Sequence, residues 1–504
     1  MRTIRQILSA LSVSVLLGAF GIGLAQSDRQ LTVSIWSDLP GFDPHGLTTA
    51  VPAQVYPNIF DRLVFRDADG DLVPALATSW TNVDENTWRF ELRNDVLWHD
   101  GELFTAADVQ FSLERLASDD SLPRHAQYST ISGVEVVNDF EVLIHTFQPD
   151  PILINRLAAG GGEILPQHYF ESVPYETFVS QPIGTGPFAF VRHEPDAALH
   201  LEAFTDHWRG VAPYSTLVFR IIPENTTAVS ELLAGGVDIV TRIEAPDMPR
   251  LENRDDILML AVPAPRHVVW YLNTDESVET GDIRVRRAID YAIDNQLIID
   301  AVLGGYGTPT RARVAPGLTG APMQYYDTYN YDPELSVQLL EEAGYGPGEL
   351  RIDIHAFGPS EHVEVIGAML EAVGINAQVI MIEQTSYATR MWDGGEFHHM
   401  AYASVGNALF DYTSALQVLS CPDGSHSSRG GWCDEDYSAI VAELQTEMDP
   451  ERRSELYSAA TDILLEELPQ IYPYTIERIA ATSADVDWTP RQDESWWMFE
   501  ATPR

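Results

Sequence analysis

A strand, a turn and a helix follow one another from residue 88 to residue 116, and this segment constrains the possible folds more than any other. Trp88, Phe90 and Leu92 alternate with polar residues, which predicts a half-buried strand. His99-Asp100-Gly101 is typical of a turn, and Thr105 is placed to cap a following helix. The apolar stripe of that helix is formed by Val109, Phe111, Leu113 and Leu116. The segment therefore predicts an α+β element.

Further short motifs lie in order along the chain. They are Gly41-Phe42-Asp43-Pro44, residues 73–80, Gly184-Thr185-Gly186-Pro187-Phe188, Asn273-Thr274-Asp275 with the stretch 282–294, and Tyr331-Asp332-Pro333-Glu334. Together with the strand-turn-helix, this ordered set resembles the family 5 extracellular solute-binding proteins, which are the peptide/nickel-type periplasmic binding proteins of ABC importers. The resemblance identifies a scaffold and leaves the ligand open.

The resemblance implies an α/β protein with the two-lobed periplasmic binding protein fold (type II, cluster C). A chain of 504 residues also exceeds what one hydrophobic core usually supports. The implied lobe I is discontinuous, at 26–70, 184–264 and 470–504, and carries an extra α+β subdomain at 71–183. Lobe II is expected at 265–469, where strands at 350–356 and 376–382 flank a helix at 361–373 and form a βαβ-like unit.

The N-terminus has the pattern of an export signal. Arg2 and Arg5 precede an apolar run that ends at Ile22, and the small residues Gly23 and Ala25 suit a signal peptidase. We expect cleavage of residues 1–25, so that the mature chain begins at Gln26. Because no cysteine lies near this site, a lipoprotein is not expected, and the predicted location is the periplasm.

The charge of the chain excludes several kinds of function. The formal net charge is -45, and all 30 basic residues are arginine. The absence of lysine excludes a Walker A lysine and a Schiff-base lysine. So acidic a protein is also a poor partner for nucleic acid or for an anionic membrane. The acidity fits a protein that works in salty water, where counterions screen the repulsion between its charges. The alternative, replacement of lysine by arginine in a GC-rich genome, explains the missing lysine but not the 75 acids.

No catalytic constellation is visible, so no enzyme is expected. The sequence has no Gly-x-Ser-x-Gly, and the glycine-rich stretch Gly160-Gly161-Gly162 lacks a serine. His398 and His399 are adjacent, and on a strand their side chains would point to opposite faces, which disfavours a metal site. We therefore predict neither a metal nor a cofactor. A periplasmic hydrolase is the competing class, and it would need a nucleophile or a metal.

Cys421 and Cys433 are the two cysteines of the chain, and glycine, serine, proline and aspartate fill most of the segment between them. Two cysteines that close such a loop in an exported protein predict a disulfide. His426 lies inside the loop, but two cysteines and one histidine fall short of a closed zinc site.

The resemblance also implies candidate ligand-binding residues. In peptide-binding relatives the end of the second-lobe strand, here 399–404, presents backbone groups to the ligand and an aspartate to its α-ammonium. The matching positions are Gly406, Asn407 and Asp411, although the usual Asp-Tyr-x-Asp-Pro pattern is absent and Asp411 could instead cap the next helix. Trp36, Thr48 and Thr49 lie where relatives line the cleft from lobe I. Tyr271 lies on the expected crossover strand and suits either a core or a ligand platform.

The expected function is capture of a di- or oligopeptide in an interlobe cleft and its delivery, by a monomer, to the permease subunits of an ABC importer. An acidic cleft would suit the α-ammonium of a peptide. An oligosaccharide is the first alternative, because 11 Trp and 20 Tyr could supply stacking platforms. A nickel chelate is the second.

Overall fold

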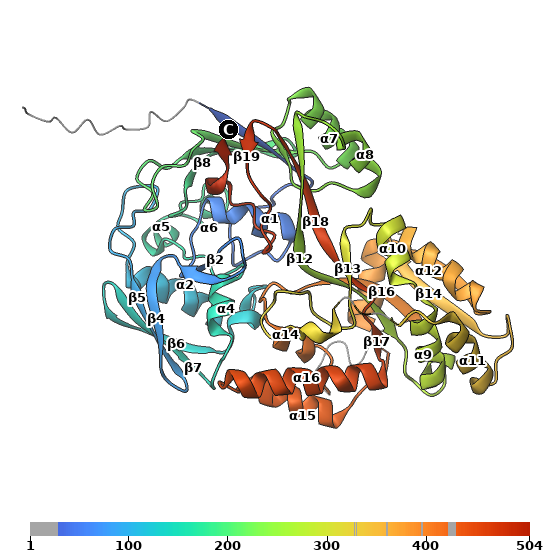
Figure 1. Ribbon diagram of the computed structural model, residues 1–504. Coiled ribbons are helices and arrows are strands. Elements are labelled where there is room, and N and C mark those ends of the chain that lie inside the picture. The colour runs from blue at the N-terminus through green and yellow to red at the C-terminus, as the bar shows by residue number, and fades with distance from the viewer. Residues whose placement is uncertain (1–28, 327, 329, 359–360, 395–396, 422–429) are drawn as a thin grey trace, which may run out of the picture.

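Two long antiparallel strands join two lobes. The computed structural model describes residues 29–504 except 327, 329, 359–360, 395–396 and 422–429, so the predicted signal peptide lies outside the described residues. Strands β12 (Ile257–Leu272) and β18 (Tyr474–Ser483) run between the lobes (Figure 1). They belong to a mixed sheet with the order β15-β14-β16-β12-β18-β11-β1-β10-β9-β8. One sheet therefore passes through both lobes.

Lobe I is built around the part of this sheet that contains β1. The alternating residues Leu31, Val33 and Ile35 of β1 are at most 1% exposed and lie in the core of the lobe. Residues near both ends of the chain contribute to this core. The elements of lobe I are β1 (Gln30–Ile35), α1 (Ala50–Val55), β2 (Val64–Arg66), β3 (Leu72–Pro74), β8 (Phe188–Glu194), β9 (Ala198–Ala203), β10 (Thr216–Ile221), α7 (Asn225–Ala234), β11 (Ile239–Val240), α8 (Met248–Leu251), β19 (Val486–Asp487) and β20 (Thr502–Pro503).

A separate four-stranded sheet, of order β4-β5-β7-β6, lies at the left of Figure 1 within the segment where we expected an extra subdomain. Its elements are β4 (Ala77–Asp84), β5 (Thr87–Leu92), α2 (Ala106–Ser118), α3 (His125–Tyr128), β6 (Ile131–Asn138), β7 (Glu141–Thr146), α4 (Leu153–Ala158), α5 (Gln167–Ser172) and α6 (Tyr175–Phe178). The predicted strand-turn-helix is confirmed here: Phe90 and Leu92 are buried, and Thr105 is the N-cap of α2.

His99 connects two of the sequence motifs to each other. His99 is half-buried, with Nε2–H donating to the Gly186 carbonyl at 2.9 Å and Nδ1 accepting from the Gly184 N–H at 3.2 Å. The second motif in turn packs on the backbone of Ile59. A Cβ on Gly184 would lie 1.8 Å from the Ile59 carbonyl oxygen, so only glycine fits there. The two motifs therefore fix the subdomain against lobe I.

Lobe II packs helices on both faces of its part of the sheet. The apolar run of β12 explains this arrangement, because Val268, Trp270 and Leu272 enter one core while Val269 and Tyr271 enter another. The predicted βαβ unit is confirmed by the parallel pair β14–β15 with α12 between them. The elements are α9 (Ile283–Ala292), α10 (Asn295–Ala301), β13 (Gly307–Pro309), α11 (Pro333–Ala343), β14 (Arg351–Phe357), α12 (Glu361–Ala372), β15 (Asn376–Ile382), α13 (Gln384–Ala388), β16 (Met400–Gly406), α14 (Tyr412–Gln417), α15 (Glu435–Leu444), α16 (Pro450–Glu467) and β17 (Gln470–Ile471).

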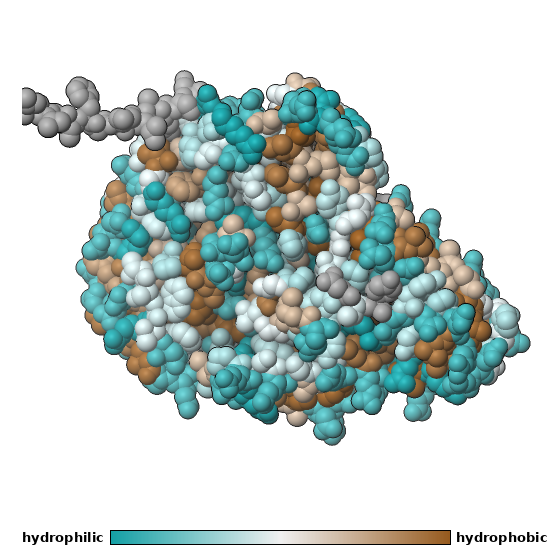
Figure 2. Space-filling view, viewed as in Figure 1, coloured by the Kyte–Doolittle hydropathy of each residue, from teal (hydrophilic) through white to brown (hydrophobic). Residues whose placement is uncertain are grey.

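Hydrophilic side chains cover much of both lobes on the face drawn in Figure 2. Among the described residues, we find no helix with the length and apolar character that a bilayer crossing requires.

Candidate functional site

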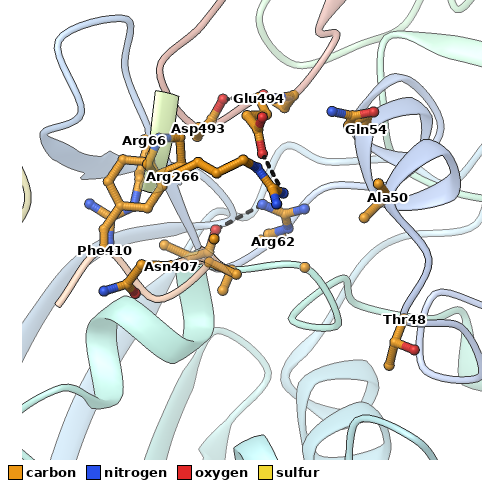
Figure 3. Close-up of a pocket in the computed structure, with 18 of the residues that line it drawn as sticks. Thr48, Ala50, Gln54, Arg62, Arg66, Arg266, Asn407, Phe410, Asp493 and Glu494 are labelled. Atoms are coloured by element: carbon orange, nitrogen blue, oxygen red, sulfur yellow. Dashed lines mark hydrogen bonds and ion pairs between the residues drawn. The ribbon is translucent and has the colours of Figure 1, made fainter. Parts of the chain in front are cut away.

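A cavity of about 340 Å³ lies between the lobes, at the point where β12 crosses from one to the other (Figure 3). Lobe I contributes Thr48, α1 and the ends of β2 and α4, while lobe II contributes residues 406–408 and Phe410. Pro265 and Arg266 of β12 and residues 493–495 near the C-terminus complete the wall. A larger surface hollow, of about 1110 Å³, is lined by lobe I residues alone. The interlobe cavity is the better candidate site because any movement of the lobes would open or close it.

An irregularity in β12 places Arg266 in this cavity. The register between β12 and β18 shifts between Pro263 and His267, where two prolines lack the N–H that a regular ladder needs. The Pro265 carbonyl instead accepts from the Asn407 N–H at 2.7 Å. Gly406 lies opposite Arg266, and a Cβ there would come within 3.1 Å of the guanidinium. The bulge thus turns Arg266 toward the cavity.

Two residues of the cavity wall have a strained backbone. Phe410 has φ 55° and Glu494 has φ 60°, and they are two of five such non-glycine residues in the part of the chain that the structure describes. A left-handed conformation is costly for side chains of this size, and it persists only where surrounding contacts enforce it. The strain is consistent with a functional cavity.

Arg66 joins the two lobes beside the cavity. Its Nη2 donates to the Leu409 carbonyl of lobe II at 3.3 Å, and its guanidinium lies 4.3 Å from the centre of the Phe410 ring. Asn155 of lobe I donates to the same Leu409 carbonyl at 2.9 Å. These contacts hold the lobes together over the cavity, so the structure represents a state in which the lobes touch.

The carboxylates at the cavity already have cationic partners. Glu494 lies 3.5 Å from Arg266 and also contacts Arg478. Burial opposes ionisation of Glu494, but these two guanidiniums outweigh it and keep its pKa below the ordinary value. Asp493 lies 3.3 Å from Arg491. Among the described residues that line the cavity, Glu494 and Asp493 are the acidic ones.

Arginines outnumber acids in the cavity wall. Arg62 forms a buried ion pair with Glu163 at 2.6 Å, and Arg266 has Glu494. Arg66 and Arg124, by contrast, donate to backbone carbonyls and form no ion pair with the described residues. Burial lowers the pKa of Arg66 to about 10, which still leaves it charged at neutral pH. In the part of the chain that the structure describes, four arginines and two carboxylates line the cavity, so the expectation of an acidic cleft is wrong.

Asp411, the predicted anchor for an α-ammonium, lies inside lobe II and is not part of the cavity wall. It is 1% exposed, and its Oδ2 lies 3.2 Å from Arg453 Nη2. Its Oδ1 accepts from the Thr413 N–H at 2.8 Å, which caps α14. The structure thus places Asp411 in the alternative role, as a helix cap, because its carboxylate is already occupied.

A family model described as "Bacterial extracellular solute-binding proteins, family 5 Middle" matches residues 71–426. This chain belongs to that family. The predicted α/β class and two-lobed fold are confirmed by the solved structures that resemble it. One of them is HbpA2 from Haemophilus parasuis, with a TM-score of 0.82 and 25% identity over 94% of this chain and 100% of that one.

Two curated relatives show how varied the ligands of similar proteins are. Heme-binding protein A of Haemophilus influenzae is 28% identical over 82% of this chain and 81% of its own length. The dipeptide-binding protein of Escherichia coli is 27% identical over 86% of each chain. Solute-binding proteins of this family are periplasmic, and the family is one of binding proteins rather than enzymes.

The other predicted ligand residues of this solute-binding protein divide into two groups. Thr48, Gly406 and Asn407 line the cavity, and Thr49 is the neighbouring N-cap of α1. The two aromatic residues lie elsewhere. Trp36 packs edge-on against Trp496, with ring centres 5.1 Å apart, and Tyr271 is 1% exposed in a lobe II core.

Sequence reasoning missed the cationic wall of this solute-binding protein, which consists of Arg62, Arg66, Arg124 and Arg266. Because the chain has 75 acids, its overall charge pointed to an acidic cleft. The single local signal was the glycine-rich stretch at 160–162. A Cβ on Gly161 would lie 3.1 Å from the Arg124 side chain, so these glycines make room for that arginine.

His398 and His399 do not point to opposite faces, because they lie in a bend before β16 rather than on a strand. Their ring centres are 4.1 Å apart, and Glu279 joins them in a group with the spacing of metal ligands. His399 is nevertheless already bonded at both nitrogens: the Asp353 N–H donates to Nδ1 at 3.0 Å, and Nε2–H donates to Glu279 at 2.8 Å. A metal at this group would have to take the place of the Nε2 proton that His399 shares with Glu279.

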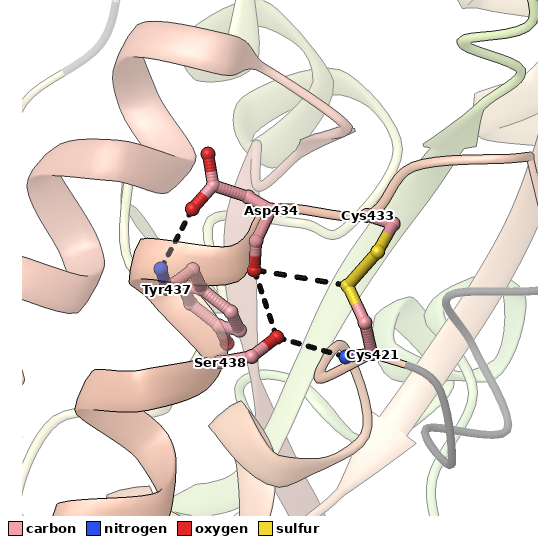
Figure 4. The surroundings of a disulfide bond; sticks show 5 residues. All are labelled: Cys421, Cys433, Asp434, Tyr437 and Ser438. Atoms are coloured by element: carbon pink, nitrogen blue, oxygen red, sulfur yellow. Dashed lines mark hydrogen bonds between the residues drawn. A yellow bond between two sulfur atoms is a disulfide. The ribbon is translucent and has the colours of Figure 1, made fainter.

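The predicted disulfide is present between Cys421 and Cys433, whose Cα atoms are 5.5 Å apart (Figure 4). It is anchored to α15: the Ser438 hydroxyl accepts from the Cys421 N–H at 2.9 Å and donates to the Asp434 carbonyl at 2.8 Å. His426 lies outside the described residues.

Proposed function

We propose that this protein captures a short peptide between its lobes and delivers it, as a monomer, to the permease of an ABC importer. The observation that carries the proposal is a cavity walled by both lobes at the strand crossover. A ligand in this position contacts both lobes at once and favours the state in which they touch, and a permease can recognise that state.

The contacts over the cavity support closure by small movements of whole lobes. Leu409 and Phe410 of lobe II meet Arg66 and Asn155 of lobe I through two hydrogen bonds and one cation–π contact. Gln492 of lobe I also donates to the Pro316 carbonyl of lobe II at 3.3 Å. Each of these contacts is weak, and contacts of this kind can break and reform as the lobes move. Ligand binding then decides which state dominates.

The size of the cavity supports a short ligand. A volume of about 340 Å³ lies at the small end of the range for sites that bind small molecules. The dipeptide-binding protein of Escherichia coli is a relative over most of its length. The wall is also poor in aromatic side chains, with Phe410 the one aromatic residue among the described lining residues, which weakens the oligosaccharide alternative.

The composition of the wall supports binding without catalysis. No histidine or cysteine is among the described residues that line the cavity. Ser495 donates to Asp493 at 2.6 Å, but this carboxylate is paired with Arg491, which makes it a weak base. A hydrolase would need an activated nucleophile with a base in reach. The residue types in this wall suit recognition of polar and charged groups.

Calorimetry on ligand-free protein tests the proposal. Di- and tripeptides should bind with micromolar or tighter affinity and one-to-one stoichiometry, while maltose, chitobiose, hemin and nickel–histidine should give no heat. Light scattering should find a monomer. A protein that binds one of these other ligands and no peptide would contradict the proposed function.

A further inference from the structure

The glycine-rich stretch at 160–162 holds Arg124 in place at the cavity wall. The Arg124 side chain lies along Gly160 and Gly161, where added Cβ atoms would come within 3.5 and 3.1 Å of it. Its Nε–H donates to the Leu47 carbonyl at 2.9 Å. The rest of the guanidinium remains available, because Arg124 is half-buried and forms no ion pair with the described residues. The backbone thus presents a cation to the cavity without neutralising it.

Arg66 is a second cation without a carboxylate partner among the described residues. It is 4% exposed, and its bonds to the Gly70 and Leu409 carbonyls leave further N–H donors free. A guanidinium so far removed from water is costly unless an anion approaches it. Arg66 and Arg124 both line one cavity, and the two acids of its wall, Glu494 and Asp493, are already paired with other arginines.

These charges do not match a neutral zwitterion. A simple dipeptide brings a single carboxylate, which leaves one of the two arginines without an anion. A peptide with an additional carboxylate would supply one anion to each arginine. We propose that the preferred cargo is a short acidic peptide, whose C-terminal and side-chain carboxylates pair with Arg66 and Arg124. This inference rests on the proposed function and adds the chemical class of the peptide.

Ala-Glu and Ala-Gln are matched probes, because they differ in charge and hardly at all in shape. A charge-assisted hydrogen bond in a partly desolvated cavity changes affinity by about tenfold to a hundredfold. Calorimetry at neutral pH should therefore show Ala-Glu binding at least about tenfold more tightly than Ala-Gln.

Arg124→Gln should bring this ratio close to one, mainly by weakening Ala-Glu. Arg124 is the better residue to change, because Arg66 also joins the lobes and its loss would alter closure. Arg192→Gln is the matched control: it removes the same charge from an exposed ion pair with Glu194, outside the cavity, and should keep the ratio of the wild type. Circular dichroism and thermal melting confirm that both variants are folded.

Each outcome separates this inference from the proposed function. Equal binding of Ala-Glu and Ala-Gln overturns the acidic preference and leaves peptide capture intact. Failure of both peptides overturns peptide capture itself. Glutarate is the third probe, because it carries two carboxylates and no peptide bond. If glutarate binds as tightly as Ala-Glu, the cavity recognises dicarboxylates in general, and the acidic-peptide assignment is wrong.

Discussion

Arg453 and Asp411 form an ion pair inside lobe II, with 3.2 Å between Arg453 Nη2 and Asp411 Oδ2. Both side chains are at most 8% exposed, and the Tyr457 hydroxyl donates to the same carboxylate. The pair fastens α16 to the start of α14, next to the loop that lines the cavity. The carboxylate that a peptide ammonium could have used is therefore part of the lobe II interior.

Asp411→Asn should destabilise the protein by about 3–5 kcal/mol, because it leaves the Arg453 charge buried without its partner. Asparagine also caps helices well, so loss of the α14 cap does not account for the expected destabilisation. Urea unfolding measures the effect. Asp449→Asn is the control, since Asp449 caps α16 at an exposed position without an arginine partner in the described residues, and it should cost much less. If Asp411→Asn instead lowers peptide affinity with little loss of stability, Asp411 reaches the ligand after all.

Stability should fall as the pH drops from about 6.5 to about 4, partly through His99. Burial lowers its pKa to about 4, and protonation would set an N–H on Nδ1 against the Gly184 N–H. The unfolded chain binds the proton near pH 6.5, so it takes up more protons than the folded chain throughout this window. Neutral His99 contributes on the order of 3 kcal/mol to the free energy of unfolding. This contribution is complete above pH 6.5 and is lost as the pH falls toward 4.

His99→Gln should flatten this part of the pH profile while costing stability at pH 7.5. Urea titrations at several pH values measure the slope. His45 and His362 remain in the variant and keep part of the slope, because burial lowers the pKa of each to about 4. His168→Gln, at a partly exposed position, is the control. An unchanged slope in His99→Gln would show that His99 does not contribute.

Gly184→Ala should destabilise the fold by at least about 1–3 kcal/mol, the usual cost of forcing an extra methyl group into a packed site. The new Cβ would collide with the Ile59 carbonyl, a backbone atom that cannot rotate away. Gly133→Ala is the matched control, because nothing lies within 4 Å of its Cβ position. Thermal melting compares the two variants. Equal melting temperatures would mean that the 184–188 motif does not pack on Ile59 as described.

Stability should rise when sodium chloride is raised from about 0.01 M to 0.1 M, because the Debye length then falls from about 30 to 10 Å. A net charge of -45 repels itself more strongly in the folded than in the expanded chain, and screening relieves that repulsion. Thermal melting across this series tests the effect. A melting temperature that stays flat or falls would remove the support for a saline habitat.

The local sequence was sufficient for elements whose pattern depends on near neighbours. Period-two alternation located β5, and turn and cap residues located the start of α2. The cysteine spacing also predicted the pairing of Cys421 with Cys433. In each case the physical cause, namely backbone geometry, capping or closure of a short loop, acts over a few residues.

Only the tertiary structure decided the chemistry of the cavity. Arg66, Arg124 and Arg266 are distant in sequence but line one cavity. They do so because one sheet passes through both lobes and β12 has a bulge where it crosses between them. Asp411 has no sequence signal that distinguishes a ligand anchor from a partner of Arg453, 42 positions away. The sequence gives the charge of each side chain. Whether that charge is available to a ligand depends on which other charges lie beside it in the fold, and long-range packing decides this.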